Sequence, residues 1–180
     1  ETEINLEIPF SPDGHIPYVD FDNGERVSFL SGSNSTYRFS SRTSDGLFTN
    51  NGVLVKGEAT ISPDRNVAYK NGYSAITSVL KIDDINENHL FAITHNEQRK
   101  SPEESDTFTA TIGLLESFDR GKSWKDNGVI IQGQDPVEPG KRVSGAGQPC
   151  AIVRSEGGRK YAQIYYIDWA SGDKIKASDQ

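Results

Sequence analysis

The sequence predicts an all-β fold, and three features of its 180 residues support this. Glycine and proline, 17 and 8 in number, recur along the chain and mark turns. Between them lie short runs rich in β-branched and aromatic residues that alternate with polar ones, as in strands with one buried face. No stretch of helical length free of glycine and proline carries the apolar spacing of an amphipathic helix.

The expected strands can be placed by residue number. They cover residues 26–30, 76–82, 90–94, 108–115, 129–131, 151–154 and 161–167. Residues 86–99 include several helix formers, but the run Phe91-Ala92-Ile93-Thr94 fits a strand better.

The strands repeat along the chain. The segment 51–57 reads N-G-V-L-V-K-G and returns as N-G-V-I-I-Q-G at 127–133, which is 76 residues later. An aromatic residue precedes each copy, Phe48 in the first and Trp124 in the second, and each follows a turn containing Asp and Gly. Such a period indicates a repeated supersecondary unit.

The second copy contains the most specific motif of the chain, S-F-D-R-G-K-S-W at residues 117–124. Asp119 can accept hydrogen bonds from the amides of its own turn, and Gly121 can adopt a positive φ where the chain reverses. Trp124 begins the outgoing strand, where its ring can pack between adjacent sheets. Ser117, Asp119, Gly121 and Trp124 are therefore predicted to be structural.

This octapeptide matches the Asp-box pattern S/T-x-D-x-G-x-S/T-W, and the chain resembles the Asp-box (BNR-repeat) β-propellers, which include sialidases and other five- or six-bladed glycoside hydrolase-like proteins. The match is good for residues 117–124, partial for 43–48 and only architectural elsewhere. The resemblance implies a β-propeller of four-stranded antiparallel blades, with residues 1–180 as a single portion of the ring.

The blades are expected at about 16–57, 75–133 and 150–180, the last of them incomplete. Two and a half to three blades are too few for a ring, since propellers typically have four to eight. We therefore expect a second chain, or a further C-terminal segment, to complete it.

Within a four-stranded meander the Asp box connects the third and fourth strands, and propellers typically bind ligands at the opposite end. The connections at that end hold acidic, aromatic and amide side chains suited to a sugar. Glu97 and Asp168 are the candidate catalytic carboxylates, and the candidate substrate-binding residues are His95, Asn96, Trp169, Arg65, Arg142 and Gln148.

Paired carboxylates could hydrolyse a glycoside, one as proton donor and the other as base or nucleophile. Asp13 or Asp20 could supply a third acid of the kind that five-bladed glycoside hydrolases use. No arginine occurs in a context that identifies the carboxylate-binding triad of sialidases. The function predicted first is a glycoside hydrolase, although its status as an enzyme stays open. The alternatives are a glycan- or protein-binding propeller without catalysis and a pure assembly scaffold.

Composition argues against two classes of partner and leaves the carbohydrate expected from the motif. The net charge of −7 argues against nucleic acid, and the short apolar runs argue against a membrane helix. Cys150 is the single cysteine, so no internal disulfide can form. His15 and His89 lack a spacing that would join His95 in a transition-metal site, and no cofactor is expected. Calcium held by loop carboxylates stays open. The first residues lack the basic and apolar regions of a signal peptide, which fits a cytosolic protein. Because the first residue is Glu1 instead of Met, a processed, secreted or periplasmic protein also stays open.

Overall fold

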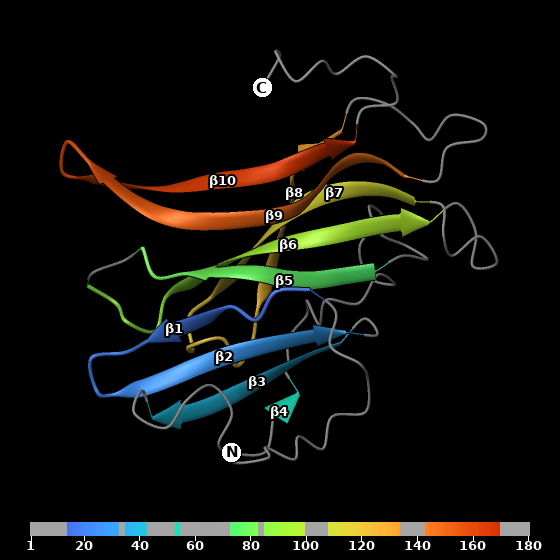
Figure 1. Cartoon of the computed structure of the whole chain (residues 1–180). Coiled ribbons are helices and arrows are strands. Elements are labelled where there is room, and N and C mark those ends of the chain that lie inside the picture. The colour runs from blue at the N-terminus through green and yellow to red at the C-terminus, as the bar shows by residue number, and fades with distance from the viewer. Residues whose placement is uncertain are drawn as a thin grey trace, which may run out of the picture.

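The computed structural model describes residues 14–32, 35–42, 53–54, 73–82, 85–99, 108–133 and 143–169, and these residues form strands arranged in two sheets (Figure 1). The predicted all-β class is confirmed. Both sheets are open in the part of the chain that the structure describes. That part contains no helix of the length and apolar character needed to cross a lipid bilayer.

The first sheet, sheet A, is an antiparallel meander at one side of the molecule. Its strands follow one another in chain order: β1 (Tyr18–Asp20), β2 (Glu25–Gly32), β3 (Ser35–Arg42) and β4 (Val53–Leu54). Strand β2 is buried from Val27 to Gly32, so both of its faces are covered. Val27 and Phe29 of this strand belong to the apolar cluster that sheet A shares with the second sheet.

The second sheet, sheet B, holds the other strands in the order β10-β9-β7-β6-β5, with β8 paired to β7. Its strands are β5 (Tyr73–Leu80), β6 (Leu90–Arg99), β7 (Phe108–Ser117), β8 (Lys125–Gln132), β9 (Val143–Glu156) and β10 (Arg159–Trp169). Each strand range expected from sequence falls on one of the observed strands, and only the range 76–82 runs past the end of its strand.

The sequence repeat has a counterpart in strand pairing. Val53 of the first copy pairs with Arg38 on β3, and Val129 of the second copy pairs with Gly113 on β7. In each case the repeated segment is the fourth strand of an antiparallel meander. The first meander is β1–β4 in sheet A, and the second is β5–β8 in sheet B. The repeat thus corresponds to the same position in two meanders.

The β9–β10 hairpin belongs to sheet B instead of forming a separate sheet. Strand β9 begins at Val143, before the expected start of the third repeat at residue 150, and pairs in parallel with the first residues of β7, Phe108 to Ala110. Strand β8 pairs only with Thr111 to Glu116, which leaves this short edge of β7 available. Gly145 meets Ala110 so closely that a Cβ would contact the Ala110 backbone, and its φ is +89°.

Two apolar clusters lie on opposite faces of the β5–β7 strands. One joins sheet A to sheet B and consists of Val19, Phe21, Val27, Phe29, Ile76, Val79, Leu90, Ala92, Leu115 and Trp124. The other joins these strands to β9 and consists of Leu80, Ile93, Ile112, Ala146 and Ala151. Figure 1 shows the same order, with sheet A on one side of β5 and the β9–β10 hairpin beyond β7.

Strand β5 lies between these two clusters and is buried along its whole length. Two serine hydroxyls connect it to its neighbours. The N–H of Ile76 donates to Ser31 Oγ of sheet A at 3.1 Å, and the N–H of Ala151 on β9 donates to Ser78 Oγ at 2.9 Å. Each bond satisfies a backbone donor that burial would otherwise leave unpaired.

The turn at 117–124 joins β7 to β8 and is closed by its own side chains. Ser117 Oγ donates to Asp119 Oδ1 at 2.8 Å and accepts from the Gly121 N–H at 2.8 Å. Asp119 also accepts from the Ser123 N–H at 2.9 Å and from the Ser123 hydroxyl at 2.6 Å. Positive φ angles of 59° at Arg120 and 76° at Gly121 reverse the chain. Local hydrogen bonds therefore fix the conformation of the turn.

Trp124 fastens this turn to sheet A. The residue is 2 % exposed, and its ring packs edge-on against Phe29 of β2 with centroids 5.6 Å apart. An edge-to-face pair of this kind adds about 0.5–1.5 kcal/mol to the gain from burial. A Cβ on Gly121 would collide with the Phe29 ring and lie 3.1 Å from Trp124, so glycine is required for steric reasons as well as for its φ.

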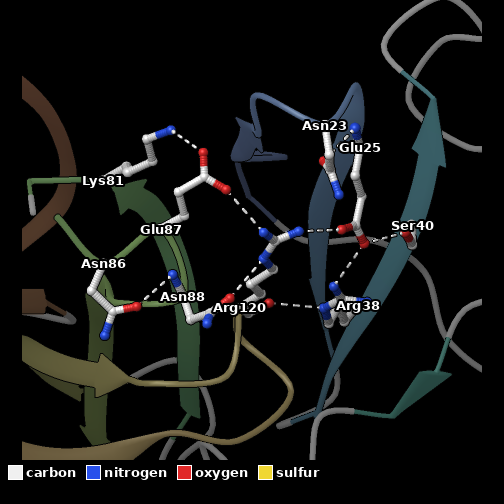
Figure 2. Close-up of polar contacts among 9 residues, drawn as sticks. All are labelled: Asn23, Glu25, Arg38, Ser40, Lys81, Asn86, Glu87, Asn88 and Arg120. Atoms are coloured by element: carbon white, nitrogen blue, oxygen red, sulfur yellow. Dashed lines mark hydrogen bonds and ion pairs between the residues drawn. The ribbon is translucent and has the colours of Figure 1, made fainter. Parts of the chain in front are cut away.

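Arg120 adds a polar connection at the same junction (Figure 2). Its guanidinium bonds to Glu25 at 2.9 Å and Glu87 at 2.9 Å and donates to Asn88 at 2.8 Å. Its Cζ also lies 4.3 Å from the centroid of the Phe21 ring. One side chain therefore links the β7–β8 turn, the β5–β6 connection and sheet A.

Glu25 is the acceptor at the sheet A side of this network (Figure 2). It accepts from the Ser40 hydroxyl at 2.6 Å and from Arg38 at 3.3 Å in addition to Arg120. Burial opposes ionisation of Glu25, but the hydrogen bonds from these three residues outweigh burial and lower its pKa. Arg38 in turn donates to the backbone carbonyl of Arg120 at 2.9 Å.

We predict that Gly121→Ala destabilises the fold by roughly 2–4 kcal/mol, because it combines a positive φ with overpacking against Phe29. Gly128→Ala is the matched control, since Gly128 also has a positive φ of 88° but a Cβ there would meet nothing within 4 Å. The control should cost only about 1–2 kcal/mol. Urea denaturation followed by tryptophan fluorescence measures both, and equal losses would contradict the steric role of Gly121.

The hydrogen bonds of Asp119 predict that the stability of the fold depends on pH. Burial opposes its ionisation, but hydrogen bonds from Ser123, Ser117 and the Lys122 amide outweigh it, so its pKa is lowered from 3.8. A lowered folded pKa means that ionised Asp119 stabilises the fold above about pH 4, and that this stabilisation is lost as the pH falls through the folded pKa. Asp119→Asn should therefore cost about 1–2 kcal/mol at pH 7 and progressively less below pH 4.

Denaturation of wild type and Asp119→Asn at pH 7, 5 and 3 measures this difference. Ser123→Ala removes one of the donors and should show a smaller version of the same pH dependence. A stability difference between wild type and Asp119→Asn that stays constant from pH 7 to pH 3 would count against the charged role of Asp119.

Candidate functional site

The 117–124 turn and Glu97 lie at opposite ends of the β6–β7 pair. Leu90 pairs with Ser117 at one end, whereas Glu97 pairs with Ala110 near the other. The part of β7 between Ala110 and Ser117 spans roughly 23 Å at the usual rise per strand residue. The side chains around Glu97 are therefore separated from the turn by most of the length of the sheet.

A cavity of about 220 Å³ lies at the Glu97 end. The side chains that give it its chemistry are those of His15, Tyr73, Thr77, His95, Glu97 and Gln148. They supply one carboxylate together with imidazole, phenol, hydroxyl and amide groups, so the wall offers both donors and acceptors. A second hollow of about 330 Å³ shares His15 and Thr77 with it.

Strand pairing explains why these residues meet. Glu97 pairs with Tyr73 and His95 pairs with Ala75, so alternate residues of β5 and β6 share one face. Gln148 reaches the same place from β9, which pairs in parallel with the first residues of β7. The cavity thus combines β5, β6 and β9 with the segment before β1.

His95 and Glu97 are in contact inside the cavity. His95 Nε2 lies 3.3 Å from Glu97 Oε1, and the N–H of Gln148 donates to His95 Nδ1 at 3.2 Å. Arg99 approaches the other carboxylate oxygen, with its Nη2 3.6 Å from Oε2. The side chains of His95 and Glu97 are only 10 % and 16 % exposed, so these contacts are largely sheltered from water.

Aromatic rings surround the imidazole of His95. The centroid distances are 6.1 Å to Trp169, 6.4 Å to Phe108 and 6.4 Å to Tyr73. Trp169 also packs edge-on against Phe108 at 6.2 Å. We expected Trp169 to bind the sugar directly. Instead it packs behind His95 with Phe108 and does not line the cavity.

The structure brings together only some of the residues expected in catalysis or substrate binding. His95, Glu97 and Gln148 share the cavity. Asn96 is fully buried on the opposite face of β6, where its Oδ1 accepts from the Ser74 hydroxyl at 2.6 Å. The physical reason is the two-residue period of a strand, which turns Asn96 away from the face that His95 and Glu97 share.

Asp168, the second carboxylate expected in catalysis, does not line the cavity either. It is exposed and pairs with Ala146, whereas its neighbour Trp169 faces His95. Successive residues of a strand point to opposite faces, so Asp168 is directed away from the cavity face. Asp20, one of the acids considered as a third carboxylate, instead forms a bidentate ion pair with Arg26 at 2.6 and 2.7 Å.

Three of the expected residues fall outside the described part of the chain: Arg65, Arg142 and Asp13. Tyr73 and Thr77, by contrast, line the cavity without having been singled out from sequence. The sequence shows that Tyr73 and Thr77 alternate with other residues along one segment of the chain. Only the register of β5 against β6, however, aligns them with Glu97. Within the described ranges no group of three or more His, Cys, Asp or Glu side chains could hold a metal ion.

A comparison of the chain with models of known protein families matches none, and a comparison with curated protein sequences also finds no match. The function of the cavity therefore has to be inferred from the geometry and chemistry of its own residues.

Proposed function

We propose that this chain is a portion of a carbohydrate-active β-propeller of the Asp-box type, and that the cavity around Glu97 binds the sugar. The observation that carries the proposal is a cavity lined by a carboxylate, an imidazole, a phenol and an amide at the sheet end opposite the 117–124 turn. The hydrogen-bond pattern of that turn supports the Asp-box assignment, because Asp119 and Ser117 bind the amides of their own turn.

The cavity wall suits a polyhydroxylated ligand. Sugar hydroxyls need partners of both kinds, and Glu97 offers acceptors while Thr77 and Tyr73 carry hydroxyls. The aromatic face of Tyr73 provides apolar contact for ring C–H groups. The adjoining hollow, about 330 Å³ and flanked by Ile16 and Tyr18, offers room for a second sugar unit.

Within this proposal Glu97 is one of the two carboxylates of glycoside hydrolysis. Hydrolysis needs one group to protonate the leaving oxygen and another to act as base or nucleophile. Because Asp168 points away from the cavity face, the second carboxylate has to come from elsewhere. Asp13 is the acid nearest in sequence to a cavity residue, since it directly precedes Gly14.

The propeller proposal also accounts for the exposed outer face of the β9–β10 hairpin. Ile152, Tyr161 and Tyr165 are 49 %, 47 % and 55 % exposed on this face. Sheet A and the β9–β10 hairpin each cover one face of the β5–β7 strands, so a further unit stacked on this face would continue the same order. That unit could come from the same polypeptide or from a second one.

The test of the proposed function is Glu97→Gln in the full-length protein, assayed on a panel of chromogenic glycosides. Loss of the ionisable group should lower kcat by at least about 100-fold on any substrate that wild type cleaves. Glu116→Gln is the matched control, because Glu116 also pairs with a histidine, His89 Nε2 at 2.9 Å, but lies at the opposite end of the sheet. An unchanged rate for Glu97→Gln would refute the catalytic role.

The second candidate is a sugar-binding propeller without hydrolysis. It is favoured by one observation: Glu97 is the single carboxylate among the described residues that line the cavity. It predicts saturable glycan binding by calorimetry with no released product, and a loss of affinity in Glu97→Gln. Asp13→Asn separates the two candidates, since it should abolish turnover only if Asp13 completes a catalytic pair.

A further inference from the structure

The two ring nitrogens of His95 face chemically different partners. A backbone amide can only donate, so the N–H of Gln148 at 3.2 Å requires a lone pair on Nδ1. The neutral ring then carries its proton on Nε2, the nitrogen that lies 3.3 Å from Glu97 Oε1. The geometry thus selects one tautomer of His95 and directs its N–H toward the Glu97 carboxylate.

The ring of His95 is also fixed in position. Tyr73, Phe108 and Trp169 pack against it at centroid distances of 6.1 to 6.4 Å. Gly147 approaches so closely that a Cβ there would lie 2.5 Å from Trp169 and 2.7 Å from His95. A ring held in this way has little freedom to turn toward a ligand.

The backbone that supplies the amide is itself unusual. Gln148 has a φ of +48°, which a residue other than glycine rarely adopts. Strained conformations of this kind persist where surrounding structure enforces them, and they cluster at functional sites. Here the strained residue is the one whose N–H determines the tautomer of His95.

Glu97 therefore has a hydrogen-bond partner at one oxygen and an ion-pair partner at the other. His95 Nε2 faces Oε1, and Arg99 Nη2 lies 3.6 Å from Oε2. From the neighbouring strands, the polar side chains that share the cavity with it are Tyr73 and Thr77 on β5 and Gln148 on β9. In this arrangement Glu97 accepts a hydrogen bond from His95 and pairs with Arg99, as an ionised carboxylate does when it acts as base or nucleophile.

We propose that His95 is a positioning residue that orients the Glu97 carboxylate toward the cavity, and that the amide of Gln148 holds it in the Nε2–H tautomer for this purpose. His95 then contacts Glu97 and not the sugar, which changes the substrate-binding role expected for it from sequence. The catalytic consequence rests on the proposed function, but the tautomer does not.

The tautomer is tested first, on the full-length protein labelled with ¹⁵N in its histidines. Long-range ¹H–¹⁵N spectra at neutral pH distinguish a bare ring nitrogen from a protonated one, and the signals missing from His95→Gln identify His95. The expected result is a bare Nδ1 and a protonated Nε2. A proton on Nδ1, or on both nitrogens, would overturn the proposal whether or not the protein cleaves a glycoside.

Kinetics on a glycoside that wild type cleaves test the positioning role. His95→Leu removes the donor and should lower kcat by roughly 10- to 100-fold, the cost of a misplaced catalytic group, with little change in KM. His95→Gln keeps an N–H near the Nε2 position and should recover much of kcat. A raised KM with kcat unchanged in His95→Leu, or equal loss of kcat in both variants, would overturn the positioning role.

His89→Leu and His89→Gln are the matched controls. His89 is also bonded to a glutamate, Glu116, but lies at the end of the sheet near the 117–124 turn. Both control variants should leave kcat and KM unchanged, and thermal denaturation of all four proteins verifies that they are folded. If wild type cleaves no glycoside, the proposed hydrolase fails while the spectra still decide the tautomer.

Discussion

The junction between the 117–124 turn and sheet A is the constraint on which the rest of the structure depends. Trp124 packs on Phe29 of β2, and Arg120 bonds Glu25 on the same strand. Both contacts start from a turn of sheet B whose backbone is already determined by Ser117 and Asp119. A rigid local turn therefore fixes the position of one sheet against the other. The apolar cluster described above packs between the two sheets.

Strand β5 transmits this constraint to the far end of the sheet. It is buried between sheet A and β9, and serine hydroxyls on both sides bind backbone amides across the boundaries. Because β5 is held along its whole length, Tyr73 at its beginning has a defined place opposite Glu97. The cavity is thus built on strands, which hold side chains more closely than loops do.

Much of the fold was predictable from sequence because the relevant signals are local. Alternating apolar and polar residues predicted the strands, and the S-x-D-x-G-x-S-W spacing predicted a turn closed by Asp119 with a tryptophan buried behind it. Glu97 and His95 were also accessible, since residues two apart on one strand share a face. Asn96 and Asp168 show the limit of such reasoning, because composition near a strand end does not reveal which face a side chain occupies.

The sequence by itself determined the strand segments, the closed turn and the proximity of His95 and Glu97 on one strand. All of these depend on neighbours a few residues apart. Only the tertiary structure decided the rest. The parallel approach of β9 to β7 brought Gln148 to Nδ1 of His95, and the register of β5 against β6 placed Tyr73 beside Glu97. Registers and crossings arise from packing between distant segments, and a shift of one residue would exchange the faces of a strand.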